Sequence, residues 1–389
     1  EGDANHLKVP GVPDVPKVPG VPGVPKVLLR PRLGGGDGDP YEVVTRDPSV
    51  TAVLRGRAWR DAAPLREGGP YPLVILSHGY PGNRFLMSHL GENLASKGYL
   101  VVAIDHAEST YDDLQGFAGT LYHRPYDQMF VLDEIDRMSR AGEGSVLGGL
   151  VDAWRAALIG YSMGGYGVVN VVGGGYSQAS PTFRNAPPNR LLAPRTAGHP
   201  DYPAAADPRI RAAVAIAPWG MPAGFWDAEG LAGIRTPILF VSGSADTVSG
   251  YERGTRAMFE AAVNADRALL TYLQANHNAG APIPPPEESY AFSKTLNGYA
   301  FTHYADPVWD NVRMNNILAH FVTAHLDVHV KGDESRRAYL DLVPRGADAR
   351  WAMDEDGRPG ATHTYWRGFA RGTAVGLMFE RASARATPD

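Results

Sequence analysis

Gly160-Tyr161-Ser162-Met163-Gly164-Gly165 is the stretch of sequence that decides the fold. It follows the apolar run at 156–159 and precedes a segment at 166–172 that can be helical. A serine flanked by glycines at a strand-to-helix corner has the pattern of a nucleophile elbow, where a side chain at either flank would collide with neighbouring backbone. The first N–H groups of the helix would face the position at which negative charge develops during attack on a carbonyl. The stretch therefore predicts a nucleophilic Ser162, and a purely structural glycine-rich turn is the alternative.

The segments on both sides of this corner alternate between apolar runs and helical patterns. Apolar runs typical of buried parallel strands lie at 73–76, 99–104, 156–159, 212–217, 238–241 and 269–273. Apolar residues at helical spacing lie at 85–97, 126–140, 253–265 and 307–330. This alternation predicts a mostly parallel sheet covered by helices on both faces, in a single domain that spans residues 41–389.

Two segments do not fit this alternation. Residues 176–208 follow the predicted elbow helix and are rich in Pro, Asn, Ala and Arg, and residues 108–125 follow the strand that ends at Ile104. Long irregular segments in compact domains are usually functional lids or disorder. We expect both to be insertions above the carboxyl edge of the sheet, where open α/β sheets bind ligands.

The N-terminal residues 1–40 differ in composition from the rest. Residues 9–26 repeat Val-Pro-x six times, and proline at every third position suits polyproline II, which has three residues per turn. A flexible low-complexity leader is the prediction, and an extended strap whose valines dock on the body is the alternative. Glu1 opens the sequence without an apolar signal core, so either a leader has been removed or the sequence has been trimmed, and the first of these weakly favours a secreted or periplasmic location over a cytoplasmic one.

A serine hydroxyl is a weak nucleophile, so it needs a base, and the base needs an orienting acid. On a strand-and-helix scaffold with such an elbow, the acid and then the base follow the serine along the chain. Asp246 lies in the loop after the predicted strand at 238–241, and His277 lies in the loop after the strand at 269–273. Chain order and placement at strand ends thus predict Ser162, Asp246 and His277 as a catalytic triad.

Other interpretations of these residues stay open. Asp246 could cap the helix that begins near Thr247, and His277 could be a hydrogen-bonded loop histidine. Asp266 precedes its strand and so belongs to the opposite edge of the sheet. His303 is the chief rival for the role of base, but it lies beyond the expected strand. Surface or core roles are expected for the histidines of the last predicted helix, His320, His325 and His329.

An oxyanion hole needs two backbone donors. Met163, the residue after the nucleophile, is the first predicted donor, and Tyr80 in the loop after the strand at 73–76 is the second. The ring of Tyr80, with Trp219 and Trp226, predicts an aromatic substrate-binding pocket. For either tryptophan a position in the core is the alternative.

Three further polar features have structural interpretations. We expect His78 to hydrogen-bond within its own loop, and Arg124 to pair with Asp127 and so anchor the neighbouring insertion. The acidic residues Asp105, Glu108, Asp112 and Asp113 are dense but lack the spacing of a metal-binding loop. No metal site is therefore predicted.

Composition excludes several classes of function. The chain has 389 residues, of which 44% are hydrophobic and 20% charged, as is typical of a globular protein. A net charge of −5 offers no basic surface for nucleic acid, and no apolar run approaches the about 18–20 residues of a membrane span. The absence of cysteine excludes disulfides, thiolate nucleophiles and Cys-based metal sites.

Taken together, these residues resemble the α/β-hydrolase superfamily, and more narrowly its branch of dienelactone-hydrolase-like proteins and platelet-activating factor acetylhydrolases. The resemblance runs over about residues 70–330 and rests on the elbow, Ser77-His78-Gly79, Val102-Ala103-Ile104-Asp105-His106, Arg124-Pro125-Tyr126-Asp127, Gly243 to Asp246 and His277-Asn278. It implies an eight-stranded, mostly parallel sheet with lid insertions, the triad roles already named, and hydrolysis of short or oxidised acyl esters. Dienelactone hydrolases proper use cysteine, which this chain lacks, so their specific reaction is not expected.

The expected function is hydrolysis of carboxylic esters through an acyl-enzyme on Ser162, with short-chain or small acyl esters as substrates. Polyesters are a second substrate class if the pocket is a shallow cleft. A phospholipase-type acetylhydrolase, a peptidase on the same scaffold and a non-catalytic binding protein are the competing functions. The expected partner is a small-molecule ester, with no cofactor, no metal, no nucleic acid and no membrane span.

Overall fold

The computed structural model describes residues 26–28, 39–203 and 205–385. Apart from Lys26, the predicted Val-Pro-x repeat lies outside these residues, so the leader and the domain boundary near residue 40 stay predictions. None of the described helices combines the length and the apolar character that crossing a bilayer requires.

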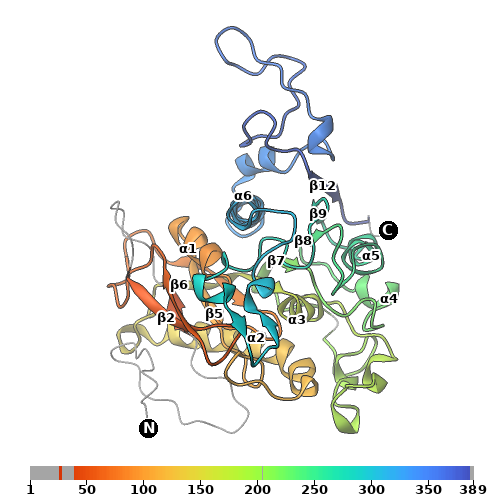
Figure 1. The fold of residues 1–389 in the computed structure, drawn as a ribbon. Helices are drawn as coiled ribbons and strands as arrows, with labels where there is room; N and C mark the ends of the chain where they lie inside the picture. Colours follow the sequence, from red (N-terminus) through yellow and green to blue (C-terminus); the bar gives the residue numbers. More distant parts are fainter. Residues whose placement is uncertain (1–25, 29–38, 204, 386–389) are drawn as a thin grey trace.

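A single eight-stranded sheet forms the centre of the molecule (Figure 1). Its strands, in spatial order, are β1 (Lys26–Leu28), β5 (Leu100–Ile104), β4 (Tyr71–Ser77), β6 (Val151–Tyr161), β7 (Ile210–Ile216), β8 (Ile238–Gly243), β9 (Arg267–Tyr272) and β12 (Leu377–Ala382). The strands from β5 to β9 run parallel, and both edge strands are antiparallel to their neighbours. The mostly parallel α/β architecture predicted from the sequence is thus confirmed.

Helices cover both faces of this sheet (Figure 1). The helices α1 (Ser88–Ser96) and α6 (Asn311–His329) lie on one face, and α2 (Phe117–Arg140), α3 (Met163–Val171), α4 (Ala228–Leu231) and α5 (Ala257–Ala261) lie on the other. An apolar core lies on each face of the sheet, and alternate strand residues belong to one core or the other. Val74 and Leu76 pack toward α1 and α6, whereas Leu73 and Ile75 pack toward α2 and α3. Side chains on a strand point to opposite faces in turn, which explains why continuous apolar runs serve both cores.

Helix α2 begins nine residues earlier than the sequence indicated. A proline inside a helix removes one backbone hydrogen bond and costs about 3 kcal/mol, so Pro125 suggested a helix that starts at residue 126. In the structure the carbonyl of Leu121, which loses its partner to Pro125, accepts a hydrogen bond from the Tyr166 hydroxyl at 3.1 Å. The irregular insertion predicted for 108–125 therefore extends only to residue 116.

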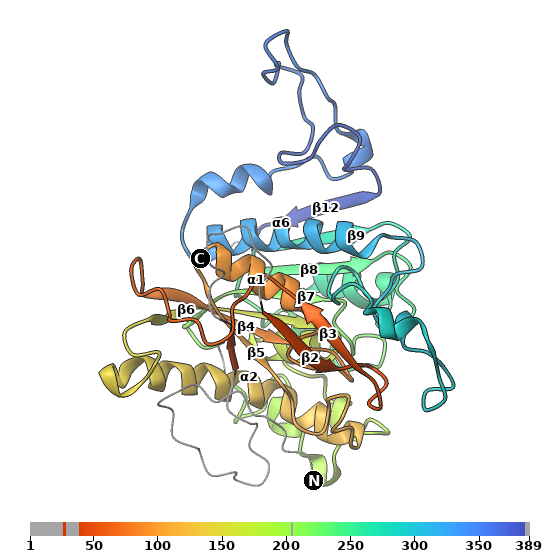
Figure 2. The same cartoon turned by 60° about the vertical axis from the view of Figure 1, so that its left-hand side comes forward.

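Several other segments differ from the sequence prediction or add detail to it. Two hairpins stand apart from the main sheet, β2 (Pro40–Val44) with β3 (Thr51–Arg55), and β10 (Phe292–Ser293) with β11 (Gly298–Tyr299). The predicted insertion at 176–208 is irregular over its described residues, 176–203 and 205–208, which contain three short 3-10 turns. The helix predicted at 253–265 is a π-turn followed by the short α5. Figure 2 shows in blue the segment between α6 and β12, much of which projects away from the sheet.

Candidate active site

Ser162 occupies a sharp corner between β6 and α3. Its backbone has φ 52° and ψ −111°, a conformation that side-chain-bearing residues rarely adopt and that costs about 1–3 kcal/mol. The Ser162 N–H donates to the carbonyl of Ile216 at 2.8 Å, which ties the corner to β7. A Cβ at Gly160 would overlap the backbone of Gly164, and a Cβ at Gly164 would overlap the carbonyl of Ser77. The flanking glycines are thus required by the close approach of neighbouring backbone, as the sequence indicated.

The structure brings the three predicted triad residues together. Ser162 Oγ lies 2.9 Å from His277 Nε2, and His277 Nδ1 lies 3.0 Å and 3.1 Å from the two carboxylate oxygens of Asp246. These distances allow the Ser162 hydroxyl to donate to His277, and the Nδ1–H of His277 to donate to Asp246. The arrangement can make Ser162 nucleophilic and can stabilise the imidazolium that forms when its proton is taken.

Asp246 is held as a charged acceptor. Burial by itself raises the pKa of Asp246, but hydrogen bonds from His277 and from the N–H groups of Val248 and Ser249 outweigh burial, so its pKa lies below the ordinary value. The Val248 and Ser249 bonds measure 2.8 Å and 2.9 Å. Asp246 thus caps the following turn and also contacts His277, so the two interpretations drawn from the sequence are compatible.

Polar residues next to the triad support the His277 loop through contacts that sequence reasoning missed. Asn276 accepts hydrogen bonds from the N–H groups of Thr247 and His277, at 3.0 Å and 2.8 Å. Asn278 accepts from the Tyr161 hydroxyl at 3.0 Å, which connects this loop to the elbow. The two asparagines that flank His277 are visible in the sequence, but Thr247 and Tyr161, which they contact, lie far from them along the chain.

Both predicted oxyanion donors are available. Met163 is the first residue of α3, and Tyr80 lies in the loop after β4. Within the part of the chain that the structure describes, no backbone or side-chain acceptor receives the N–H of Tyr80 or Met163. Unpaired N–H groups beside a nucleophile are what an oxyanion hole requires, so the assignment of Tyr80 and Met163 remains our proposal.

Arg124 does not pair directly with Asp127, so that part of the sequence interpretation is corrected. Its guanidinium is fully buried and donates to the carbonyls of His78 and Gly79, the second at 3.0 Å, and to the hydroxyl of Ser109. Burial lowers the pKa of Arg124 to about 9. The residue therefore fixes the loop that carries the Tyr80 N–H, because a forked guanidinium can bind two neighbouring carbonyls at once.

Replacement of Arg124 by lysine is expected to reduce kcat about tenfold to a hundredfold, with a smaller effect on KM. A single ammonium cannot hold both carbonyls in the same geometry, so the Tyr80 N–H would lose its alignment. Steady-state kinetics on a short-chain p-nitrophenyl ester measures the effect, and Arg371→Lys, at an exposed position, serves as the matched control. A lowered melting temperature, with unchanged kcat at temperatures where the variant is still folded, would assign Arg124 a purely structural role.

A second chain of serine, histidine and aspartate lies beneath the site. Ser77 Oγ lies 2.8 Å from His106 Nε2, and His106 Nδ1 lies 2.7 Å from Asp127. All three side chains are buried, and Gln128 also donates to Ser77 Oγ at 3.0 Å. Burial raises the pKa of Asp127 to about 7 and lowers the pKa of His106 well below its ordinary value. Because no substrate can reach Ser77, we interpret this chain as structural.

A cavity of about 300 Å³ opens at Ser162. Its walls come from the loops that follow β4, β6, β8 and β9 and from residues 302–307, and they include Tyr80. Neither Trp219 nor Trp226 lines this cavity. The Trp226 ring is 3% exposed and donates to the carbonyl of Gly174 at 2.8 Å, which makes it a core residue instead of a pocket wall. Trp219 packs edge-on against Phe117, with 5.2 Å between ring centroids.

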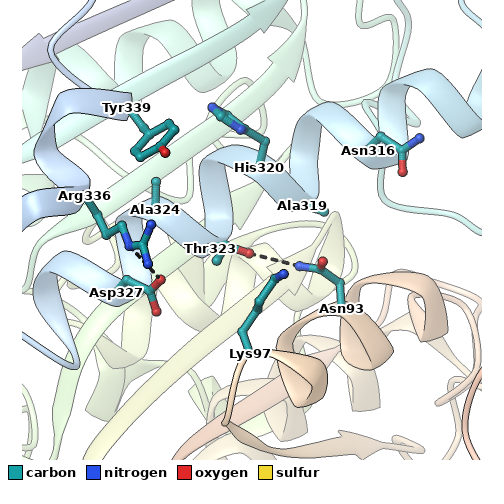
Figure 3. A pocket seen from close by; sticks show the side chains of 10 residues that line it. All are labelled: Asn93, Lys97, Asn316, Ala319, His320, Thr323, Ala324, Asp327, Arg336 and Tyr339. Atoms are coloured by element: carbon teal, nitrogen blue, oxygen red, sulfur yellow. Dashed lines mark hydrogen bonds and ion pairs between the residues drawn. The ribbon is translucent and has the colours of Figure 1, made fainter. Parts of the chain in front are cut away.

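A second cavity, of about 340 Å³, lies between α1, α6 and the 3-10 turn at Glu334–Tyr339 (Figure 3). Asn93 donates across it to Thr323 at 2.9 Å, and Arg336 faces Asp327 at 3.7 Å. Its lining contains no serine. The smaller cavity at Ser162 is therefore the candidate active site.

The acidic residues Asp105 and Asp113 contact neighbouring protein groups. Asp105 forms an ion pair with Arg84, and Asp113 accepts the N–H of Glu108 at 2.8 Å. Within the described ranges, no three His, Asp or Glu side chains form a group that could hold a metal ion.

Comparisons with known proteins bear on the same regions. The family model for platelet-activating factor acetylhydrolase, isoform II, matches residues 50–112, which include β4, Tyr80 and β5. The chain is 26% identical to cutinase est1 of Thermobifida alba over 215 residues, which are 55% of this chain and 56% of that protein. It is 47% identical to platelet-activating factor acetylhydrolase of Bos taurus over 58 residues, which are 14% of this chain and 13% of that protein.

The chain thus spans little more than half the length of cutinases est1 and est2 of Thermobifida alba. The fold agrees with the similarity, since the eight-stranded, mostly parallel sheet and the corner at Ser162 are those expected from the sequence resemblance. The chain has the α/β-hydrolase fold, and it is similar to cutinases and to platelet-activating factor acetylhydrolases.

Proposed function

We propose that this chain is a serine carboxylic-ester hydrolase that works through an acyl-enzyme. The observation that carries the proposal is the unbroken hydrogen-bond chain from Ser162 through His277 to Asp246 at the floor of an open cavity. The names of the relatives, cutinases and acetylhydrolases, support ester hydrolysis as the reaction.

In the first half of the reaction, His277 takes the proton of Ser162 as its oxygen attacks the ester carbonyl. Asp246 stabilises the resulting imidazolium, and the N–H groups of Met163 and Tyr80 bind the oxyanion. The imidazolium then protonates the leaving alcohol, and the acyl group remains on Ser162. In the second half, His277 deprotonates a water molecule, which releases the acid and regenerates the serine.

The preferred substrates are esters of short acyl chains. The volume of about 300 Å³ is at the lower end of the range of about 300–1,000 Å³ found for ligand pockets. The match over residues 50–112 favours a phospholipase-type acetylhydrolase as the second candidate. Similarity to cutinases favours polyesters as a further substrate class.

A series of p-nitrophenyl esters of increasing acyl length tests this assignment. We expect kcat/KM to be highest for acetate and butyrate and to fall toward decanoate and longer chains, because a short acyl chain already fills a cavity of about 300 Å³. A preference for long chains would contradict the small-acyl assignment. Turnover of chromogenic aminoacyl amides at comparable rates would favour a peptidase, and the absence of fluorophosphonate labelling would favour a non-catalytic binding protein.

A further inference from the structure

Gln128 connects the two segments that carry the proposed oxyanion donors. Its side chain leaves α2 one helical turn after Arg124 and is fully buried. Its Nε2 atom donates to the carbonyl of Gly164 at 2.9 Å and to the hydroxyl of Ser77 at 3.0 Å. Since a carbonyl can only accept, the group that faces Gly164 must be the NH₂ of the amide, and its two N–H bonds serve the two partners.

The two partners of this amide lie close to the oxyanion donors along the chain. Gly164 directly follows Met163 in the first turn of α3. Ser77 ends β4, three residues before Tyr80. The two segments are in contact, because a Cβ at Gly164 would overlap the carbonyl of Ser77. A single side-chain amide therefore bridges α3 and the end of β4.

The position of the Gln128 amide lowers the stability of the fold in two ways. A Cβ at Gly167 of α3 would lie only 2.7 Å from Gln128 Nε2, so the amide requires glycine there, although glycine in a helix costs about 1 kcal/mol relative to alanine. Gln128 Oε1 is buried and has no hydrogen-bond partner among the described residues, and such an oxygen costs about 1–3 kcal/mol. Features that lower stability are common at functional sites, which favours a functional role for this amide.

We propose that Gln128 is a positioning residue for the oxyanion hole, whose amide fixes the first turn of α3 against the end of β4. The N–H groups of Met163 and Tyr80 then point to the same oxygen. Each donor must lie about 2.7–3.1 Å from the developing oxyanion, and a misplacement of about 1 Å can cost a hundredfold in rate. Arg124 fixes the loop of Tyr80, whereas Gln128 fixes the position of α3 relative to that loop. This inference rests on the proposed ester hydrolysis at Ser162.

Gln128→Met tests the proposal, because methionine keeps the length of the side chain and removes both donors. We expect kcat on a short-chain p-nitrophenyl ester to fall about tenfold to a hundredfold, with KM within about twofold of the wild type. The melting temperature should change little, since the substitution also removes the unpaired Oε1.

Inhibition by a short-chain trifluoromethyl ketone gives a readout that a merely structural role would not move. The Ser162 oxygen adds to the ketone carbonyl, the hydroxyl proton passes to His277, and the carbonyl oxygen becomes an oxyanion in the proposed hole. Such an adduct resembles the transition state. The inhibition constant of the ketone should therefore rise in Gln128→Met by about the factor by which kcat/KM falls.

Gly167→Ala displaces the same amide without changing Gln128. The added methyl group takes the place of the Nε2 atom, which can move because it lies at the end of a flexible side chain. Alanine favours the helix by about 1 kcal/mol over glycine, so the variant should fold. We expect kcat to fall as in Gln128→Met. Because both substitutions act on one amide, the double variant should lose no more activity than Gln128→Met.

Asn170→Leu is the matched control, because Asn170 is also a fully buried amide, on the same helix α3. Its Nδ2 atom donates to the carbonyls of Gly174 and Arg195, at 3.0 Å and 3.3 Å, and its Oδ1 has no partner among the described residues. It lies toward the other end of α3 from Ser162. At temperatures where this variant is folded, kcat and the inhibition constant should stay within about twofold of the wild type.

Wild-type kcat in folded Gln128→Met or in Gly167→Ala overturns the proposal, and so does a loss of kcat with unchanged affinity for the ketone. An equal loss of kcat in Asn170→Leu also overturns it, since any buried amide of α3 would then have the same effect. A wild type that neither hydrolyses the ester nor binds the ketone contradicts the proposed function itself.

Discussion

Ser162→Ala is expected to lower kcat for ester hydrolysis by about a millionfold, since loss of the nucleophile removes the contribution of the whole triad. The substitution deletes one oxygen atom that is bonded to His277. Alanine takes the positive φ of the elbow at about the same cost as serine, so the fold should persist. Steady-state kinetics on a short-chain p-nitrophenyl ester, with circular dichroism to verify folding, gives the measurement.

The matched control is Ser77→Ala. Ser77 also contacts a histidine that contacts an aspartate, but it is buried beneath the site. A fluorophosphonate probe should label the wild type and Ser77→Ala, and should fail to label Ser162→Ala. Persistent labelling of Ser162→Ala, or turnover within tenfold of the wild type, would mean that another residue is the nucleophile.

Asp246→Asn is expected to lower kcat by about ten-thousandfold. The asparagine amide cannot stabilise an imidazolium, and its NH₂ group favours the tautomer of His277 that presents an N–H to Ser162. The asparagine oxygen can still accept the N–H groups of Val248 and Ser249, so the turn after β8 should keep its cap. The melting temperature is therefore expected to change little, although kcat falls by about ten-thousandfold.

This substitution separates the two roles of Asp246. If the residue acted only as a cap, Asp246→Asn would retain more than about a tenth of the wild-type kcat, because asparagine caps as well as aspartate does. Asp266→Asn is the control, since Asp266 precedes β9 and lies at the opposite edge of the sheet. Equal losses in the two variants would indicate a general effect of removing charge and would contradict the triad assignment.

Strand positions and the candidate triad could be predicted because their signals are local. Leu73 to Leu76 and Ile238 to Val241 are continuous apolar runs, and the structure buries each of these residues in a central parallel strand. Ser162 stands in a turn whose glycines are required by backbone contacts. Asp246 and His277 each follow a strand. Parallel strands end at the same edge, so chain order and strand ends were enough to bring the three residues together.

Partners that come from distant segments could not be predicted in this way. The sequence pointed to a helix break at Pro125, but Tyr166 reaches across from α3 to satisfy the carbonyl that this proline leaves free. Trp226 comes after a strand whose carboxyl end faces the site, which suggested a pocket residue. In the structure its ring is buried in the core. Charge suggested a pair between Arg124 and Asp127, whereas Arg124 holds the carbonyls of His78 and Gly79.

The sequence by itself determined the alternation of strands and helices, the corner at Ser162 and the order of serine, acid and base. These features depend on side-chain periodicity and on backbone conformations that act over a few residues. Only the tertiary structure decided that Arg124 fixes the loop carrying Tyr80. It also decided that His303 lines the cavity at Ser162, with its Nε2 atom 2.9 Å from the Tyr111 hydroxyl. The reason is physical: a buried polar group must find a hydrogen-bond partner, but which partner lies within reach depends on how the distant segments pack.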